Sequence, residues 1–241
     1  MIPKIFKFKK HLITYLCKEE LKMLLNEIFS EEIYSVKLDS KTPTIIDAGA
    51  NIGLATIYFK EKYPDSKILA FEPNPNTIPI LEENIETNRL NNVQIFNVAL
   101  GKKKCTRTFF IDSSGNCAFS TSSFQKNAWN GKQRTLPIEV NVEKLSEYIS
   151  EDVDLVKIDI EGAEAEVLED LKVNDKLKYV HNILIEYHPN KHISLNKLIS
   201  NYLADFNTET KELGEGLVLI LGKKRIQKRE HLTSIPVKYF Y

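Results

Sequence analysis

The sequence has no net charge, because 33 lysines and arginines balance 33 aspartates and glutamates over 241 residues. A chain without an overall positive field has no global attraction for nucleic acid, which leaves only a local basic patch for such a role. No apolar run is long enough to cross a bilayer. The apolar stretch near the N-terminus is interrupted by Lys18, Glu19 and Glu20, too early for a signal peptide.

Cysteines are few, and they follow no ligand or scaffold pattern. Cys17, Cys105 and Cys117 are odd in number and lack CxxC spacing, which argues against a disulfide scaffold and a zinc site. They fit a reducing compartment, so we expect a cytoplasmic protein. The chain also lacks internal repeats and Pro- or Gly-rich linkers. With 42% hydrophobic and 27% charged residues, it has the composition of one folded domain.

Apolar segments of strand length alternate with segments of helical spacing, which predicts a mostly parallel sheet with helices on both faces. The predicted strands are Thr44–Asp47, Lys67–Glu72, Val93–Val98, Asp154–Ile158 and Ile183–Tyr187, closed by an antiparallel hairpin of Phe206–Thr210 and Leu217–Leu221. The helices are expected at Gly53–Tyr63, Asn76–Arg89, Ala163–Leu171 and Ser194–Tyr202, with a short one at Val142–Ile149. This is a seven-stranded Rossmann-like α/β fold.

Three regions follow from this organisation: a helical cap over residues 1–43, with an amphipathic helix from about His11 to Phe29, a main domain over 44–222, and a basic tail over 223–241. The alternation breaks after the third strand. Two β-like segments, Thr106–Asp112 and Thr135–Val142, enclose a polar loop from Ser113 to Arg134. Loops of this length are often functional. Its aromatic residues, Phe119, Phe124 and Trp129, either form a lid over an acceptor or pin the loop to the core.

The segment that follows the first strand is a glycine turn that leads into a helix. Gly49 permits a sharp turn, and Gly53 allows the helix to pack closely against the strand. A dinucleotide fingerprint needs another glycine where pyrophosphate crosses the helix start, but Asn51 stands there. S-adenosylmethionine (SAM), a nucleoside without phosphates, tolerates this side chain. The turn therefore favours SAM over a dinucleotide.

Polar side chains stand at the ends of three successive strands, where ligands bind in open α/β sheets. Asp47 and Asn51 can hydrogen-bond the amino-acid part of SAM, and Glu72 can accept both ribose hydroxyls. Asn97 can face the adenine. Each residue alone could equally form a turn or cap a helix. Their occurrence at successive strand ends favours a cofactor site.

Two further strands end in pairs of ionisable residues. Asp159 and Glu161 are two positions apart, as are Glu186 and His188, so each pair leaves its strand on one side. On adjacent strands the pairs would converge on one crevice and serve acid–base chemistry. His188 could instead be a satisfied core histidine. Glu164 and Glu166, by contrast, are expected to be solvated helix residues. A divalent ion such as Mg²⁺ or Mn²⁺ suits the four converging groups, but they also suffice without metal.

Several of these motifs together resemble the FkbM-type methyltransferases. They are Asp47-Ala-Gly-Ala-Asn-Ile-Gly, Phe71-Glu-Pro, Val98-Ala-Leu, Lys157-Ile-Asp-Ile-Glu-Gly-Ala-Glu and Ile185-Glu-Tyr-His-Pro. The resemblance covers about Thr44 to Pro189 and implies a class I methyltransferase fold. It also implies SAM as cofactor and methyl transfer to a hydroxyl on a sugar or another small molecule. On these motifs the cofactor site would contain Asp47, Gly49, Ala50, Asn51, Gly53, Glu72, Pro73, Asn97 and Ala99.

Other functions stay open on the sequence alone. An RNA methyltransferase would use the basic tail, but an amino-methylating motif is missing after Asp159, and no cysteine follows a proline as in the cytosine enzymes. An NAD-dependent oxidoreductase is disfavoured by Asn51. A non-catalytic binding module is disfavoured by the acids of the fourth and fifth strands. The acceptor, the oligomeric state and the choice between Asp159 and His188 as base are not determined by the sequence.

Overall fold

The computed structural model describes residues 2–112, 122–126, 135–189, 193–214 and 216–225. The chain begins with strands β1 (Lys4–Phe8) and β2 (His11–Tyr15), helix α1 (Lys18–Leu25) and a π-helix (Asn26–Ser30). There follow β3 (Thr44–Ala48), α2 (Leu54–Lys62), β4 (Lys67–Phe71), α3 (Ile78–Thr87), β5 (Val93–Phe96), β6 (Ala99–Leu100), β7 (Cys105–Asp112) and β8 (Thr135–Glu143). After a 3₁₀-helix (Leu145–Tyr148), the fold is completed by β9 (Val153–Ile158), α4 (Glu164–Val173), a 3₁₀-turn (Leu177–Tyr179), β10 (Val180–Tyr187), α5 (Leu195–Tyr202), β11 (Phe206–Gly214) and β12 (Leu217–Lys224).

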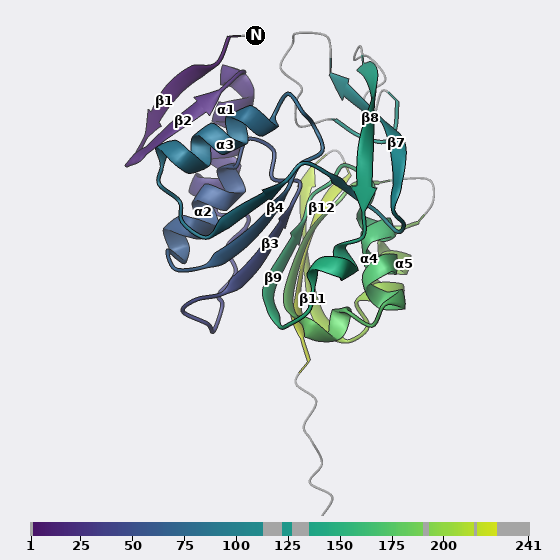
Figure 1. The fold of residues 1–241 in the computed structure, drawn as a ribbon. Coiled ribbons are helices and arrows are strands. Elements are labelled where there is room, and N and C mark those ends of the chain that lie inside the picture. Colours follow the sequence, from purple (N-terminus) through teal and green to yellow (C-terminus); the bar gives the residue numbers. More distant parts are fainter. Residues whose placement is uncertain (1, 113–121, 127–134, 190–192, 215, 226–241) are drawn as a thin grey trace, which may run out of the picture.

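Within the described residues, seven strands form the main sheet in the order β11-β12-β10-β9-β3-β4-β5. The pairs from β10 to β5 are parallel, whereas β12 is antiparallel to both β10 and β11. This confirms the predicted fold with its antiparallel C-terminal hairpin (Figure 1). The strand order reverses between β3 and β9, and at such a switch point the carboxyl ends of two strands open a crevice.

Both faces of the sheet are buried, which explains the almost continuous apolar strands. In β3, Ile45 packs into a core with α2 and the N-terminal segment, while Ile46 packs into a core with α4 on the opposite face. Neither side chain is exposed to solvent. Figure 1 shows these helices on either side of the sheet. The predicted strands and helices of this region are confirmed, with ends that differ by a few residues.

The prediction of a helix from His11 to Phe29 is wrong at its N-terminal end. Residues His11–Tyr15 form strand β2, which pairs antiparallel with β1, and the helix starts only at Lys18. The reason is the alternation in β2, where His11 and Ile13 are buried and Leu12 between them is exposed. The helix is also interrupted, since its last turn is a π-helix. The N-terminal region is therefore a hairpin followed by a helix.

A small sheet carries the β-like segments that interrupt the alternation. β8 pairs antiparallel with β7 and parallel with β6, so both predicted segments are strands. Most of the loop between them, with Phe119 and Trp129, lies outside the described residues. Its residues 122–126 are described, and Ser123 bridges to Phe110 of β7.

Three smaller points concern the predicted regions. Strand β12 continues to Lys224, so the sheet extends two residues beyond the expected domain end at 222, and residues 226–241 of the tail lie outside the described residues. Cys105 is exposed and free. Among the described residues, no helix has the length and apolar character to span a membrane.

The turn after β3 is held against two neighbouring strands. The amides of Gly49 and Ala50 both donate to the carbonyl of Phe71, at 2.9 Å. Gly49 has a φ of +81°, and a Cβ at this position would lie 1.8 Å from the carbonyl oxygen of Asp159. Glycine is required here for two independent reasons, backbone conformation and close approach.

Asn84 of α3 fastens the N-terminal hairpin to the helix layer. Its fully buried amide accepts from the Thr14 N–H at 2.6 Å and donates to the carbonyls of Thr14 and Ile52 at 3.0 and 2.8 Å. One turn later, the more exposed Asn88 makes the same two bonds to Leu12. The side chains of the two asparagines thus make the hydrogen bonds with the β2 backbone that a neighbouring strand would otherwise make.

Replacing Asn84 with Ala should lower the free energy of unfolding by about 2–4 kcal/mol, because it leaves buried backbone groups without partners. Asn88→Ala is the matched control and should cost about 1 kcal/mol, because water can reach the groups that it frees. Urea unfolding measures both. Equal losses in the two variants would contradict this account of the hairpin.

Replacing Gly49 with Ala should destabilise the fold far more than Gly214→Ala. Gly214 also has a positive φ, +101°, but no atom of the described residues lies within 4 Å of the point that a Cβ would occupy there. Only the conformational cost of about 1–2 kcal/mol therefore applies to Gly214. At Gly49 the clash with strand β9 is added to that cost. Urea unfolding of both variants separates the two effects, and similar losses would argue against close strand contact.

Candidate active site

Two cavities open at the switch point, and Gly49 and Glu72 line both of them. The first, of about 560 Å³, is bounded by the glycine turn, by Asp159 and Glu161, and by residues of the N-terminal segment. The second, of about 420 Å³, is more apolar and is lined by Phe71, Pro73 and the chain around Ala99. An elongated ligand with a polar and an apolar end therefore fits across the pair.

Glu72 is held between two backbone amides at the junction of the cavities. Its carboxylate accepts from the N–H of Asn51 at 2.9 Å and from that of Asn74 at 2.8 Å. Asn51 has a φ of +49°, which asparagine tolerates better than most residues. Burial raises the pKa of Glu72 to about 7, although both amides lower it. The group is therefore positioned, nearly enclosed and only partly ionised at neutral pH.

Of the predicted cofactor residues, Ala50 and Asn51 line the first cavity, and Pro73 and Ala99 line the second. Gly49 and Glu72 line both cavities, whereas Asp47, Asn97 and Gly53 line neither and support the walls in different ways. Asp47 is fully buried and accepts from the Thr56 hydroxyl at 2.7 Å, so it does not reach the cavity. The exposed Asn97 donates to the carbonyls of Glu72 and Pro73 at 2.9 and 3.2 Å. The Cβ of a residue at Gly53 would lie 2.7 Å from Leu81 of α3, so this glycine serves helix packing rather than the expected contact with β3.

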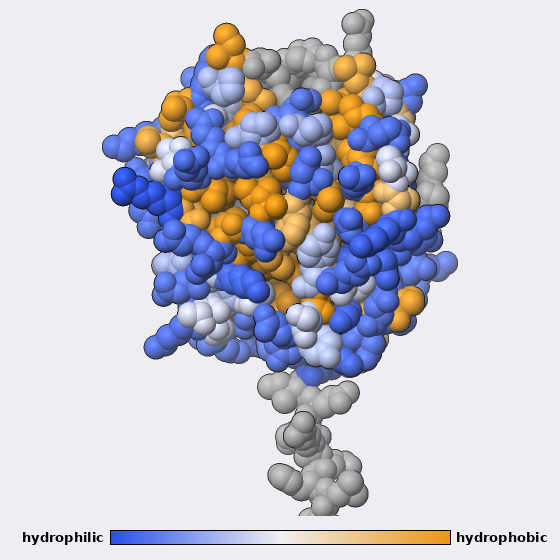
Figure 2. Space-filling view, in the orientation of Figure 1, coloured by the Kyte–Doolittle hydropathy of each residue, from blue (hydrophilic) through white to orange (hydrophobic). Residues whose placement is uncertain are grey.

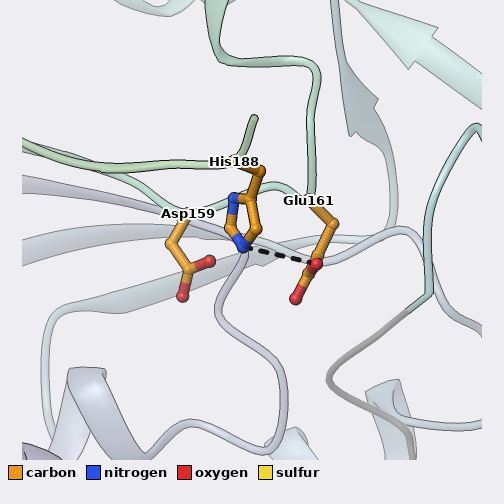
Figure 3. Close-up of side chains that lie close together, drawn as sticks. All are labelled: Asp159, Glu161 and His188. Atoms are coloured by element: carbon orange, nitrogen blue, oxygen red, sulfur yellow. Dashed lines mark ion pairs between the residues drawn. The ribbon is translucent and has the colours of Figure 1, made fainter. Parts of the chain in front are cut away.

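The structure brings the four predicted catalytic residues together at the ends of β9 and β10. His188 Nε2 lies 3.4 Å from Glu161 and 3.8 Å from Glu186. In Figure 3 the His188 ring lies between the side chains of Asp159 and Glu161, with one ring nitrogen directed toward the Glu161 carboxylate. One ligand atom of each of these three lies within 4.8 Å of the other two. They are thus the described residues best placed to share a divalent ion, and Glu186 stands outside this group.

His188 is clamped from its other side by a residue that we expected to be solvated. Glu164 is fully buried, and its carboxylate lies 2.9 Å from His188 Nδ1, which corrects that expectation. Burial alone would lower the pKa of His188, but the bond to Glu164 and the charge of Glu161 outweigh it and raise the pKa to about 10. His188 is therefore an imidazolium at neutral pH. Glu166, in contrast, is half-buried and pairs with Arg107 at 2.9 Å.

Glu161 occupies an unusual backbone conformation for its residue type. Its φ is +58°, next to Gly162 at +101°. Its carbonyl accepts from the Ser123 hydroxyl at 2.8 Å, and the Gly162 N–H donates to Glu164 at the same distance. Non-glycine residues persist in this region only where their surroundings hold them, which is common at functional sites. The turn aims the Glu161 carboxylate at the cavity.

Lys157 of β9 is a site residue that the sequence reasoning missed. Its buried ammonium donates to the Gly49 carbonyl at 2.7 Å and lies 3.1 Å from Asp47 and 3.5 Å from Asp159. Burial alone would lower the pKa of Lys157, but these two carboxylates raise it above its usual value. The sequence spacing could have indicated this position, because Lys157 and Asp159 are two residues apart and so lie on one side of the strand.

Tyr34 is the second missed residue. It comes from the N-terminal segment, lines the first cavity, and places its hydroxyl 3.1 Å from Asp159 and 3.4 Å from Glu186. Nothing in its local sequence indicates this role, because the contact spans 125 residues.

Phe124, the one described aromatic of the predicted lid, packs edge-on against Phe109 with ring centroids 5.3 Å apart. It also lines the second cavity, so packing against the core and bordering a cavity are combined in one residue. Figure 2 shows apolar residues gathered over the middle of the face on which Figure 1 places β3, β4 and β9, with hydrophilic residues around them.

Comparison with known proteins identifies relatives that methylate. Methyltransferase 1 of Beauveria bassiana is 34% identical over 185 residues, which cover 70% of this chain and 74% of the relative. The 2-O-methyltransferase NoeI of Sinorhizobium fredii is 26% identical over 145 residues, 54% of this chain and 58% of the relative. The hexuronic acid methyltransferase AglP of Haloferax volcanii is 27% identical over 184 residues, 74% and 70% of the respective chains.

The fold is also that of a solved methyltransferase. The crystal structure of methyltransferase FkbM from Methylobacillus flagellatus KT superimposes with a TM-score of 0.55 at 14% identity, over 77% of this chain and 45% of that one. The family model of the methyltransferase FkbM domain matches residues 47–209, which include the glycine turn and all four predicted catalytic residues. The chain therefore belongs to the FkbM methyltransferase family.

Proposed function

We propose that this protein is a SAM-dependent O-methyltransferase that acts on a hydroxyl of a sugar, glycan or other small molecule. The observation that supports this best is the shared cavity at the switch point. It joins the glycine turn and Glu72, which suit the donor, to the ionisable residues Asp159 and Glu161, which suit the acceptor. Donor and acceptor groups thus face one enclosed space, as an in-line transfer requires.

In this proposal the donor lies across both cavities. Glu72 would accept hydrogen bonds from the donor's ribose hydroxyls, and Pro73 and Ala99 would border its adenine in the more apolar second cavity. Ala50 and Asn51 of the turn would hold its methionine part in the first cavity, which Asp159 also lines. When bound, the donor would supply an electrophilic methyl group.

Asp159 is the base that we propose for the acceptor. The acceptor oxygen forms a bond to the methyl carbon, the carbon–sulfur bond breaks with its electron pair going to sulfur, and the hydroxyl proton passes to the Asp159 carboxylate. Asp159 lines the cavity and lies next to the Lys157 ammonium, whose positive charge attracts the carboxylate. His188 is less suited to accept the proton, because it already holds one at neutral pH.

The hydroxyl acceptor is supported by the relatives. NoeI is named as a 2-O-methyltransferase, which supports an oxygen acceptor, and AglP is named as a hexuronic acid methyltransferase, which supports a sugar-derived acceptor. The proposed chemistry needs no divalent ion, because cationic groups of the chain already face these carboxylates: Lys157 lies beside Asp159, and His188 lies beside Glu161. We therefore expect transfer to continue in the presence of EDTA.

The purified protein should bind SAM in calorimetric titrations and should not bind NADH. Incubation with methyl-labelled SAM and cell extract should label a small hydroxylated product, and Asp159→Asn should lower its formation by at least about a hundredfold. The matched control is Asp152→Asn, an exposed aspartate at the other end of β9. NADH binding in place of SAM, labelling of RNA, or full turnover by Asp159→Asn would contradict the proposal.

SAM affinity should rise with pH between 6 and 8, because Glu72 has a pKa of about 7 and only its ionised form accepts both ribose hydroxyls. Below pH 7 the carboxyl is mostly protonated and must lose its proton to bind. Calorimetry should show about a tenfold decrease in Kd across this range.

Glu72→Gln should bind SAM more weakly and should lose most of this pH dependence. Glu83→Gln, on the exposed face of α3, is the control and should behave as the unmodified protein does. If the SAM affinity of Glu72→Gln still rises with pH, a group other than Glu72 causes the pH dependence, which would contradict the prediction.

A further inference from the structure

Tyr34 lies outside the matched family domain, which begins at residue 47, yet it belongs to the cavity. The segment after the π-helix returns over the carboxyl ends of β9 and β10 and carries this side chain inward. Tyr63 secures the same segment, since its hydroxyl donates to the Val36 carbonyl at 2.7 Å and accepts from the Leu38 N–H at 2.9 Å. The Tyr34 ring itself stacks on Phe59, with centroids 6.4 Å apart.

Tyr34 is only 4% exposed, and its hydroxyl stands between two carboxylates. It donates to Asp159 at 3.1 Å and lies 3.4 Å from Glu186. On the opposite side, Asp159 faces Lys157 at 3.5 Å, and that ammonium lies 5.6 Å from the centre of the Tyr34 ring. The Asp159 carboxylate is thus held by a cation from its own strand and by a neutral donor from the N-terminal segment.

We propose that Tyr34 is a positioning residue for methyl transfer, which holds the Asp159 carboxylate toward the donor and separates it from Glu186. This role rests on the proposed function, which places Asp159 beside the positively charged sulfonium of the methyl donor. A phenol suits this place, since it supplies a hydrogen bond to a carboxylate without adding charge beside a sulfonium. The N-terminal segment thereby contributes a functional group to the site and does more than cover the sheet.

The separation of Asp159 from Glu186 affects the orientation of the Asp159 carboxylate, because several other charged groups surround the two acids. Glu27 of the π-helix lies close enough to act on both electrostatically, and Glu161 and His188 face them from the neighbouring turns. Without the Tyr34 hydroxyl, Asp159 and Glu186 would lose the donor that lies within hydrogen-bond distance of both. The Asp159 carboxylate would then be free to turn away from the cavity.

A double-mutant cycle on SAM binding tests the proposal without any acceptor. Tyr34→Phe should weaken SAM binding about five- to tenfold in calorimetry, since it removes a hydrogen bond to a charged group. The same change in an Asp159→Ala background should alter Kd by less than about twofold, because Tyr34 acts through Asp159. Thermal unfolding of each variant checks that it is folded. If Asp159→Ala does not fold, the isosteric Asp159→Asn takes its place in the cycle.

Tyr63→Phe is the matched control, because it releases two hydrogen bonds of the same segment without touching a carboxylate. It should lower thermal stability and leave the Kd for SAM within about twofold. Equal weakening by Tyr34→Phe and Tyr63→Phe, or full additivity with Asp159→Ala, would overturn the positioning role. If the unmodified protein binds no SAM, the proposed function itself fails, which is a distinct result.

Discussion

The site depends on one buried cation. Lys157 joins the two strand ends that meet at the switch point, because its ammonium reaches the Gly49 carbonyl, Asp47 and Asp159 at once. An ammonium that is 2% exposed would cost several kcal/mol without such partners. Gly49 allows the approach, since a side chain there would collide with β9. The donor turn and the proposed base are therefore positioned by the same contacts.

The remaining acids are arranged around this centre from separate segments. His188 connects Glu161 and Glu186 on one side with the buried Glu164 on the other. The N-terminal segment adds Tyr34, and the hairpin that precedes it is fastened to α3 through Asn84. A segment outside the matched family domain thus lines the first cavity. This explains why its packing against the sheet is extensive and includes buried aromatic rings.

Much of the fold could be predicted because local signals agree with the tertiary structure. Buried parallel strands such as β4 are almost continuous apolar runs, and the turn at Gly49 is marked by its glycine. The N-terminal hairpin was misjudged because β2 is short and mostly buried, and its turn at Lys9 has a positive φ without glycine or asparagine. Local spacing there fits a helix as well as a strand, and contact with Asn84 decides between them.

The site was predictable where spacing places side chains on one side of a strand, as for Asp159 with Glu161 and Glu186 with His188. The same rule applies to Lys157, but a lysine inside an apolar strand does not by itself indicate a site. Glu164 was misjudged because acids in a first helical turn are usually solvated, and only the fold reveals His188 beside it. Tyr34 has no local signal. Contacts between distant segments are what the sequence alone does not supply.

The most direct test of this account is a crystal structure with S-adenosylhomocysteine bound. The account predicts a nucleoside across both cavities, with its ribose hydroxyls on the Glu72 carboxylate and its sulfur facing Asp159. A nucleoside bound elsewhere, or one in these cavities that leaves Glu72 without contact, would contradict it.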